Sequence, residues 1–206
     1  MVNPRLVRSL HDEGSYCDDE LMAEYLGGVL AAGRSPSGRD DRAVSWSNLI
    51  TSMSALQLRT HFIFYREWAH ALHGRSDIEF SQDRDAAQMY VDLADIIPVL
   101  KETVPDIDHD AMMAPIISGL LRMDLIESRC DYGRAVEMRS TGSVPSDLPF
   151  IFACRVTPSI AGMELYGWAC GLTGITPAQF VAAPEVLEIE ADIKRPKVVL
   201  PNISPK

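Results

Sequence analysis

The chain lacks long hydrophobic runs. Its longest apolar stretches, such as residues 114–121, are far shorter than the roughly 20 residues that a membrane-spanning helix needs. The N-terminus has no basic region followed by an apolar core and a small-residue cleavage site, so the sequence predicts no secretory signal. These two absences predict a cytoplasmic protein without a membrane partner.

Cysteines and catalytic motifs are also scarce. The four cysteines form no C-x-x-C pair and are predicted to be reduced thiols packed as small apolar side chains: Cys17, Cys130, Cys154 and Cys170. The chain has no G-x-S-x-G nucleophile motif, no Walker A motif and no Rossmann glycine pattern. We therefore predict that the protein is not an enzyme and binds no cofactor.

Basic residues are outnumbered, with 19 Lys and Arg against 29 Asp and Glu and a net charge of −10. Most of the acidic excess lies in residues 78–110, where nine acids accompany two bases. This charge opposes non-specific attraction to nucleic acid or anionic lipid. The acidic stretch is most simply a set of solvated helix faces and loops.

What the chain does contain is helical periodicity. Apolar residues at helical spacing predict three helices. The first is capped by Asp18 or Asp19 and runs to residue 32, and the second covers residues 46–53. The third begins after a cap at Ser54 and ends near residue 73. Gly27 and Gly28 lie inside the first helix, where each costs about 1 kcal/mol relative to alanine. We expect a close approach of a second helix to offset that cost.

The second half combines helices with short strands. We predict an acidic helix at residues 85–97 that ends or kinks at Pro98, and a strongly apolar helix at residues 111–127. Two β-prone stretches, residues 135–138 and 150–156, flank a polar loop. Further helices are expected to begin at 157–158 and 176–177, and residues 186–193 are suited to a strand.

The predicted fold class is mainly α with a small β wing. We divide the chain into a helical subdomain at residues 1–77, an acidic linker helix and loop at 78–110, a winged-helix-like domain at 111–183 and an extended C-terminal tail at 184–206. The prolines of the tail exclude a helix and disfavour a central strand. We expect residues 198–200 to pack on their own domain and residues beyond 201 to be mobile.

Three groups of residues resemble metal sites, and each has a simpler explanation. Glu67 and His70 have the Glu-x-x-His spacing, but a di-iron bundle needs that motif twice plus two further glutamates. The alternating acids at 106, 108 and 110 lack the glycine and the final glutamate of a calcium loop, so Asp108 or Asp110 is expected to cap the next helix. The acids at 18–20 suit the positive end of a helix dipole. We predict no metal.

The order of helix, strand, loop, strand and helix after residue 111 resembles a winged helix. A DNA reader of this type needs cations along its recognition helix and wing. Here each arginine has an acid close by in the sequence, which weakens the case for DNA. Five residues remain as candidates for contact with nucleic acid or a partner protein: Arg122, Arg129, Arg134, Arg139 and Arg155.

One stretch, residues 15–31 with the sequence SYCDDELMAEYLGGVLA, is similar to a pattern of the abortive-infection alpha (Abi-alpha) family of bacterial proteins. That family has an acidic helix start that leads through an aromatic position into a small-residue segment. Residues 45–58 resemble the family's next helix, and residues 157–162 fit its C-terminal part. Relative to that family, we expect the usual N-terminal region before the motif to be missing here, and Gly27-Gly28 replaces larger residues.

The resemblance implies a bacterial or prophage-borne protein linked to phage resistance, and it carries over no catalytic residue. We therefore expect a non-enzymatic interaction or scaffold protein of phage defence, with a protein partner or a second copy of itself. The alternatives are a winged-helix DNA-binding regulator and, third, an uncharacterised hydrolase. A regulator should show a basic face, and an enzyme should show a pocket with convergent ionisable groups.

Overall fold

The computed structural model describes residues 1–8, 19–35, 37, 40–75, 87–105, 108–142, 144–182, 189 and 191–201, with the main chain alone at 109, 110 and 182. About 55% of the described residues are helical, and they include a small antiparallel sheet of four strands. The coarse prediction, mainly α with a small β part, is confirmed. Within the described ranges, no helix is both long and apolar enough to cross a bilayer.

Three N-terminal helices lie close to their predicted positions: α2 (Glu20–Ala32), α3 (Arg42–Ser52) and α4 (Ala55–Ala71). The Asp19 carboxylate accepts a hydrogen bond from the Met22 amide at 3.1 Å and so caps α2. At the start of α4, the Ser54 hydroxyl and the Gln57 side chain each accept from the other residue's amide, which forms a capping box. α3 begins earlier than the predicted residue 46. Residues 15–18 of the Abi-alpha-like motif lie outside the described part.

The acidic helix predicted at residues 85–97 is wrong over residues 89–92 and confirmed over residues 93–97. Residues 85 and 86 lie outside the described part, and the rest forms a strand, β1 (Met89–Asp92), followed directly by α5 (Leu93–Thr103). The Asp92 carboxylate accepts from the Ala94 amide at 3.0 Å, so the last residue of β1 also caps α5. Pro98 does not end the helix, because the buried Val99 and Leu100 anchor the second half of α5 in the core.

The apolar helix predicted at residues 111–127 is α6 (His109–Arg122). Asp108 stands at its N-cap position, but the Asp108 side chain makes no capping hydrogen bond. α6 stops earlier than predicted because Asp124 adopts a left-handed conformation, with φ of 57°. The Leu125 amide then bonds back to the Leu120 carbonyl at 2.9 Å, which satisfies a terminal carbonyl of the helix. Leu125 leaves the helix but stays buried.

The strand predicted at residues 150–156 is confirmed as β3 (Phe152–Val156), whereas the one predicted at 135–138 is wrong. β2 (Asp131–Arg134) comes earlier, and residues 135–138 belong to a short helix, α7 (Ala135–Ser140). A strand would place Ala135 and Glu137 on one face. The helix instead buries Ala135 and Met138, three positions apart, and leaves Glu137 exposed.

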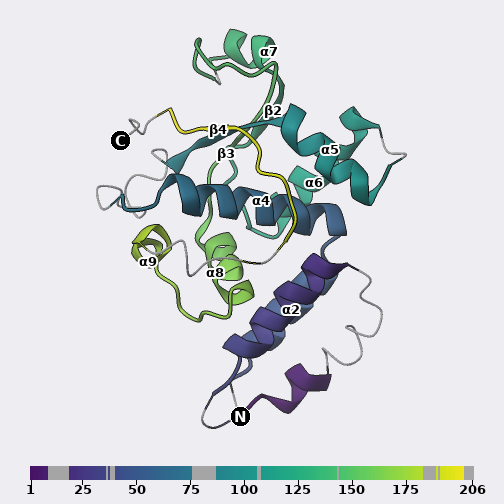
Figure 1. Cartoon of the computed structure of the whole chain (residues 1–206), viewed down its shortest axis with the longest axis vertical. Coiled ribbons are helices and arrows are strands. Elements are labelled where there is room, and N and C mark those ends of the chain that lie inside the picture. Colours follow the sequence, from purple (N-terminus) through teal and green to yellow (C-terminus); the bar gives the residue numbers. More distant parts are fainter. Residues whose placement is uncertain are drawn as a thin grey trace.

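The sheet has the order β2-β3-β1-β4, and every neighbouring pair is antiparallel. The two-stranded wing that we expected is therefore one side of a larger sheet, since β1 and the tail strand β4 (Val198–Val199) extend it. One face of the sheet joins the main core beneath the helices, and the other covers a smaller cluster under α7. Figure 1 shows β2 leading to α7 at the far end of the molecule from α2.

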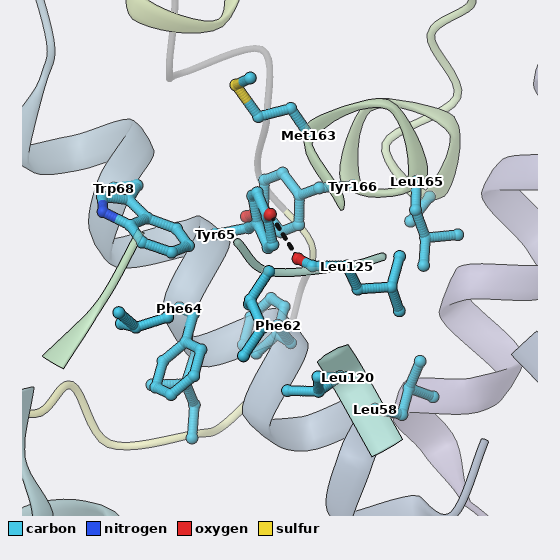
Figure 2. Close-up of a cluster of buried hydrophobic side chains, with 14 of the residues drawn as sticks. Leu58, Phe62, Phe64, Tyr65, Trp68, Leu120, Leu125, Met163, Leu165 and Tyr166 are labelled. Atoms are coloured by element: carbon cyan, nitrogen blue, oxygen red, sulfur yellow. Dashed lines mark hydrogen bonds between the residues drawn. The ribbon is translucent and has the colours of Figure 1, made fainter. Parts of the chain in front are cut away.

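Two more helices complete the core. α8 (Ile160–Ala169) begins later than the predicted Thr157-Pro158, because the Ser159 hydroxyl accepts from the Gly162 amide at 3.0 Å and takes the capping role. α9 (Pro177–Ala182) begins at its predicted proline, after Thr176. α4 lies across the centre (Figure 1), and its aromatic side chains meet those of α8 around Tyr65 and Tyr166 (Figure 2).

The predicted close helix approach is confirmed at one of the two glycines. A Cβ atom added to Gly28 would lie 1.7 Å from the carbonyl oxygen of Ala169, at the end of α8. A Cβ atom at Gly27 would meet nothing within 4 Å. Only Gly28 therefore allows α2 to contact α8.

The C-terminal tail packs on its own domain at residues 198–200, as predicted. Val198 and Val199 pair with Val91 and Tyr90 of β1, at an edge of the sheet. The strand predicted at residues 186–193 is absent from residues 189 and 191–193, and its remaining residues lie outside the described part. The predicted mobility beyond residue 201 falls outside the described part as well.

Candidate functional site

Two of the five candidate arginines line one hollow. Arg134 ends β2, Arg139 lies in α7, and both line a hollow of 460 Å³ that also contains Phe150 and Phe152. Arg155 lies in β3 and pairs with a carboxylate of β2, that of Asp131. Arg122 is exposed at the end of α6, and Arg129 is exposed just before β2. Neither lines this hollow.

Arg134 of β2 and Arg139 of α7 both contact other parts of the protein. The Arg139 guanidinium donates to the Leu148 carbonyl at 2.6 Å, and the Arg134 guanidinium lies 5.9 Å from the centre of the Phe152 ring. α6, which would be the recognition helix of a winged helix, has a single Lys or Arg in its whole sequence, Arg122. A continuous basic face along α6 and the wing is therefore not present in this region.

A second concave site, which we call the helix-side cleft, lies between the sheet and two helices. It has a volume of 480 Å³, and α5, α6, the hairpin and α7 supply its lining: Leu93, Ile97, Met113, Tyr132, Gly133, Arg134, Glu137 and Phe152. Most of these side chains are apolar, and the cleft carries one cation and one anion. Clefts of this kind bind apolar groups and use a few polar groups for orientation.

The cleft borders an open strand edge. β2 is the end strand of the sheet, and in the described part no strand pairs with its outer edge. A third hollow, of 320 Å³, shares residues 132–134 and Glu137 with the helix-side cleft, so both follow β2. A Cβ atom at Gly133 would meet nothing within 4 Å. An unpaired edge of this kind can accept a further strand.

Large apolar side chains are exposed around this end of the sheet. Val136 and Ile151 are 64% and 77% exposed, and Tyr132 and Phe152 are 38% and 39% exposed. Single exposed apolar residues are ordinary, but a group of them beside a cleft is typical of an interaction surface. We call these four residues together with the helix-side cleft the β2-end surface.

A buried polar cluster elsewhere has a structural role. The Tyr25 hydroxyl lies 2.9 Å from His61 Nδ1, and His61 Nε2 lies 3.1 Å from the Gly162 carbonyl. A carbonyl oxygen only accepts, so Nε2 carries the proton and Nδ1 accepts from Tyr25. Burial lowers the pKa of His61 to about 3, so the ring is neutral. Tyr25 and His61 are fully buried, so the hydrogen bonds link α2, α4 and α8 inside the core.

Tyr65 performs a similar task at the turn after α6. Its hydroxyl donates to the Leu125 carbonyl at 2.6 Å (Figure 2) and accepts from the Ser159 amide at 3.0 Å. Burial raises the pKa of Tyr65. The Tyr65 hydroxyl thus joins α4 to the turn after α6 and to the segment between β3 and α8.

The Glu67-x-x-His70 pair is not arranged as a metal site. The Glu67 carboxylate is 1% exposed and binds two guanidiniums, that of Arg195 at 2.7 Å and that of Arg66 at 3.0 Å. Arg66 also donates to the Ile193 carbonyl at 2.8 Å, so this ion pair fixes the tail against α4. In the ranges that the structure describes, no three His, Cys, Asp or Glu side chains are placed to hold a metal ion.

Sequence reasoning found part of the β2-end surface and missed the rest. It singled out Arg134, which lines the helix-side cleft, but not the apolar lining from α5 and α6. Those residues carry the ordinary pattern of buried helix positions, so only their meeting with β2 marks them as a site.

Comparisons with protein-family models, with curated proteins and with solved structures find no match for this chain.

Proposed function

We propose that the protein is a non-enzymatic interaction protein that binds an extended segment of a partner protein along β2. The observation that carries the proposal is the coincidence of an unpaired strand edge with the helix-side cleft. In strand addition, main-chain hydrogen bonds supply affinity and pockets for alternate side chains supply specificity. The cleft would take the apolar side chains of such a segment.

Charge narrows the choice of partner segment. The chain has a net charge of −10, which favours a partner whose apolar residues alternate with basic ones. The order α6, β2, α7, β3 and α8, with β2 and β3 paired, supports a winged-helix-like unit as the scaffold. The link to phage defence rests on the similarity of residues 15–31 to the Abi-alpha family, and it is part of the proposal.

The test is selection of peptides from a displayed random library on the immobilised full chain, followed by affinity measurement with fluorescence anisotropy. We expect selected peptides with alternating apolar residues. Ile97→Glu, inside the cleft, should weaken their binding at least tenfold, because it places a charge in an apolar site. Ile160→Glu is the matched control, since Ile160 is exposed at the start of α8 and does not line the cleft.

Hydrogen exchange provides the second readout. Binding by strand addition should slow exchange of the amides in residues 131–134, while those of α9 should be unchanged. Equal affinity of the Ile97→Glu and Ile160→Glu variants for the selected peptides, or unchanged exchange in β2, would contradict the proposal.

A further inference from the structure

Two thiols face one another beside the β2-end surface. The sulfur atoms of Cys130 and Cys154 are 4.0 Å apart. Cys154 is fully buried in the middle of β3, opposite Tyr132 of β2. Cys130 directly precedes β2, is half-buried, and lines the 320 Å³ hollow.

We propose that Cys130 and Cys154 form an oxidative modification site that hydroperoxides, such as hydrogen peroxide, convert into a disulfide. An S–S bond of about 2.05 Å requires the sulfurs to approach by roughly 2 Å. Cys130 lies outside the paired residues of β2, which begin at Asp131, so its main chain is free to shift without breaking the ladder. The inference does not depend on the docking function of β2.

The two thiols have different tasks. Contact with Cys130 and burial raise the pKa of Cys154, so Cys154 remains a thiol. Cys130 borders the hollow and is the sulfur that peroxide reaches. Its thiolate attacks one peroxide oxygen, the O–O bond breaks, and hydroxide leaves, which gives a sulfenic acid on Cys130.

The second step closes the bridge. The Cys154 sulfur attacks the Cys130 sulfur, the S–O bond breaks, and water leaves with the proton of the thiol. Overall, two thiols and one hydrogen peroxide give one disulfide and two waters. The bridge encloses α7 within a covalent loop, and this loop should raise the melting temperature because it restricts the unfolded chain.

The experiment treats the reduced full chain with hydrogen peroxide and maps its tryptic peptides by mass spectrometry without reductant. We expect residues 130–134 to be joined to residues 140–155, with the loss of two hydrogen atoms, and we expect dithiothreitol to reverse both the bond and the rise in melting temperature. Cys154→Ala should leave Cys130 as a sulfenic acid that dimedone traps, whereas Cys170→Ser should form the bridge normally.

The peptide map of the parent chain is decisive even if the Cys154→Ala variant does not fold. Separate oxidation of Cys130 and Cys154, or a bridge from either of them to Cys17 or Cys170, would overturn the proposal.

Discussion

Single residues decide two of the contacts that hold the helices together. Gly28 lets α2 touch the end of α8, because any Cβ atom would lie 1.7 Å from a carbonyl oxygen. His61 links α2 to α8 through Tyr25 and the Gly162 carbonyl. A side chain at Gly28 would overlap the backbone of α8. A charge at position 61 would be buried without solvation.

The glycine pair makes a matched test. Gly28→Ala should lower the free energy of unfolding by about 1–3 kcal/mol, because even one methyl group overlaps the Ala169 backbone. Gly27→Ala should raise the free energy of unfolding by up to about 1 kcal/mol, since it improves helix propensity in open space. Urea melts of both variants measure these changes. Gly28→Leu should be worse than Gly28→Ala, and a Gly28→Ala variant as stable as the parent would disprove the close approach.

His61 should make stability depend on pH. An unfolded histidine titrates near pH 6.5, whereas burial lowers the pKa of His61 in the folded chain to about 3. Between these pH values the unfolded state binds one more proton at His61 than the folded state does. The contribution of His61 to the free energy of unfolding is therefore complete above about pH 6.5. It falls by about 1.4 kcal/mol per pH unit as the pH drops toward 3.

Urea melts of the parent and of His61→Gln at about pH 7 and about pH 5 check the expectation. The parent should lose about 2 kcal/mol more than the variant over that interval. His73→Gln, exposed after α4, serves as the control and should behave as the parent does. Equal losses in the parent and in His61→Gln would show that His61 is not the responsible group.

At the scale of elements, β1 and the C-terminal tail depend on each other. β1 lies between β3 and β4, and the Asp92 amide donates to the Lys197 carbonyl at 2.9 Å. The Lys197 amide in turn donates to the Asp95 carboxylate at 3.0 Å, and Arg195 binds the buried Glu67. The tail is thus tied to the sheet, to α5 and to α4.

Truncation after Pro196 should therefore destabilise the protein. It removes β4 and both main-chain bonds of Lys197 while keeping Arg195. We expect a loss of about 1–2 kcal/mol, or about 2–8 °C in Tm for a chain of this size.

Truncation after Pro201 is the control for the tail, because it keeps every described contact. Calorimetry of the two shortened proteins gives the comparison. If the chain cut after Pro196 melts like the parent but no longer binds the peptides selected on the full chain, the tail takes part in docking rather than in the fold.

For the whole molecule, the distribution of charge opposes a role on DNA. The net charge is −10, and the arginines at the hairpin are engaged by Asp131, Leu148 and Phe152. The molecule instead gathers exposed apolar groups at the end where β2 is unpaired. This distribution of surface chemistry is the basis of the proposed docking of a partner segment.

We expect affinity for random duplex DNA to be weaker than the typical non-specific Kd of about 10⁻⁴–10⁻⁶ M at physiological salt. Fluorescence anisotropy with a labelled duplex over a range of salt concentrations measures it. Micromolar binding with a salt slope that reports several released counterions would support the DNA-binding regulator instead.

The sequence by itself determined where several helices begin, because caps act within a few residues. Asp19, Ser54 with Gln57, and Thr176 before Pro177 all mark helix starts that the structure contains. It also indicated β3 and the need for a close contact at the glycine pair. For the candidate site it supplied Arg134, but no reason to connect that residue with α5 or α6.

Only the tertiary structure decided β1, α7, the tail strand and the β2-end surface. A strand at residues 89–92 is stabilised by partners at 153–156 and 198–199, and no local pattern encodes pairing over such separations. Likewise, Ile97, Met113 and Phe152 become one cleft, and Cys130 meets Cys154, because packing of distant segments brings them together. Local hydrogen bonds fix the ends of helices, whereas burial shared among distant residues fixes strands and sites.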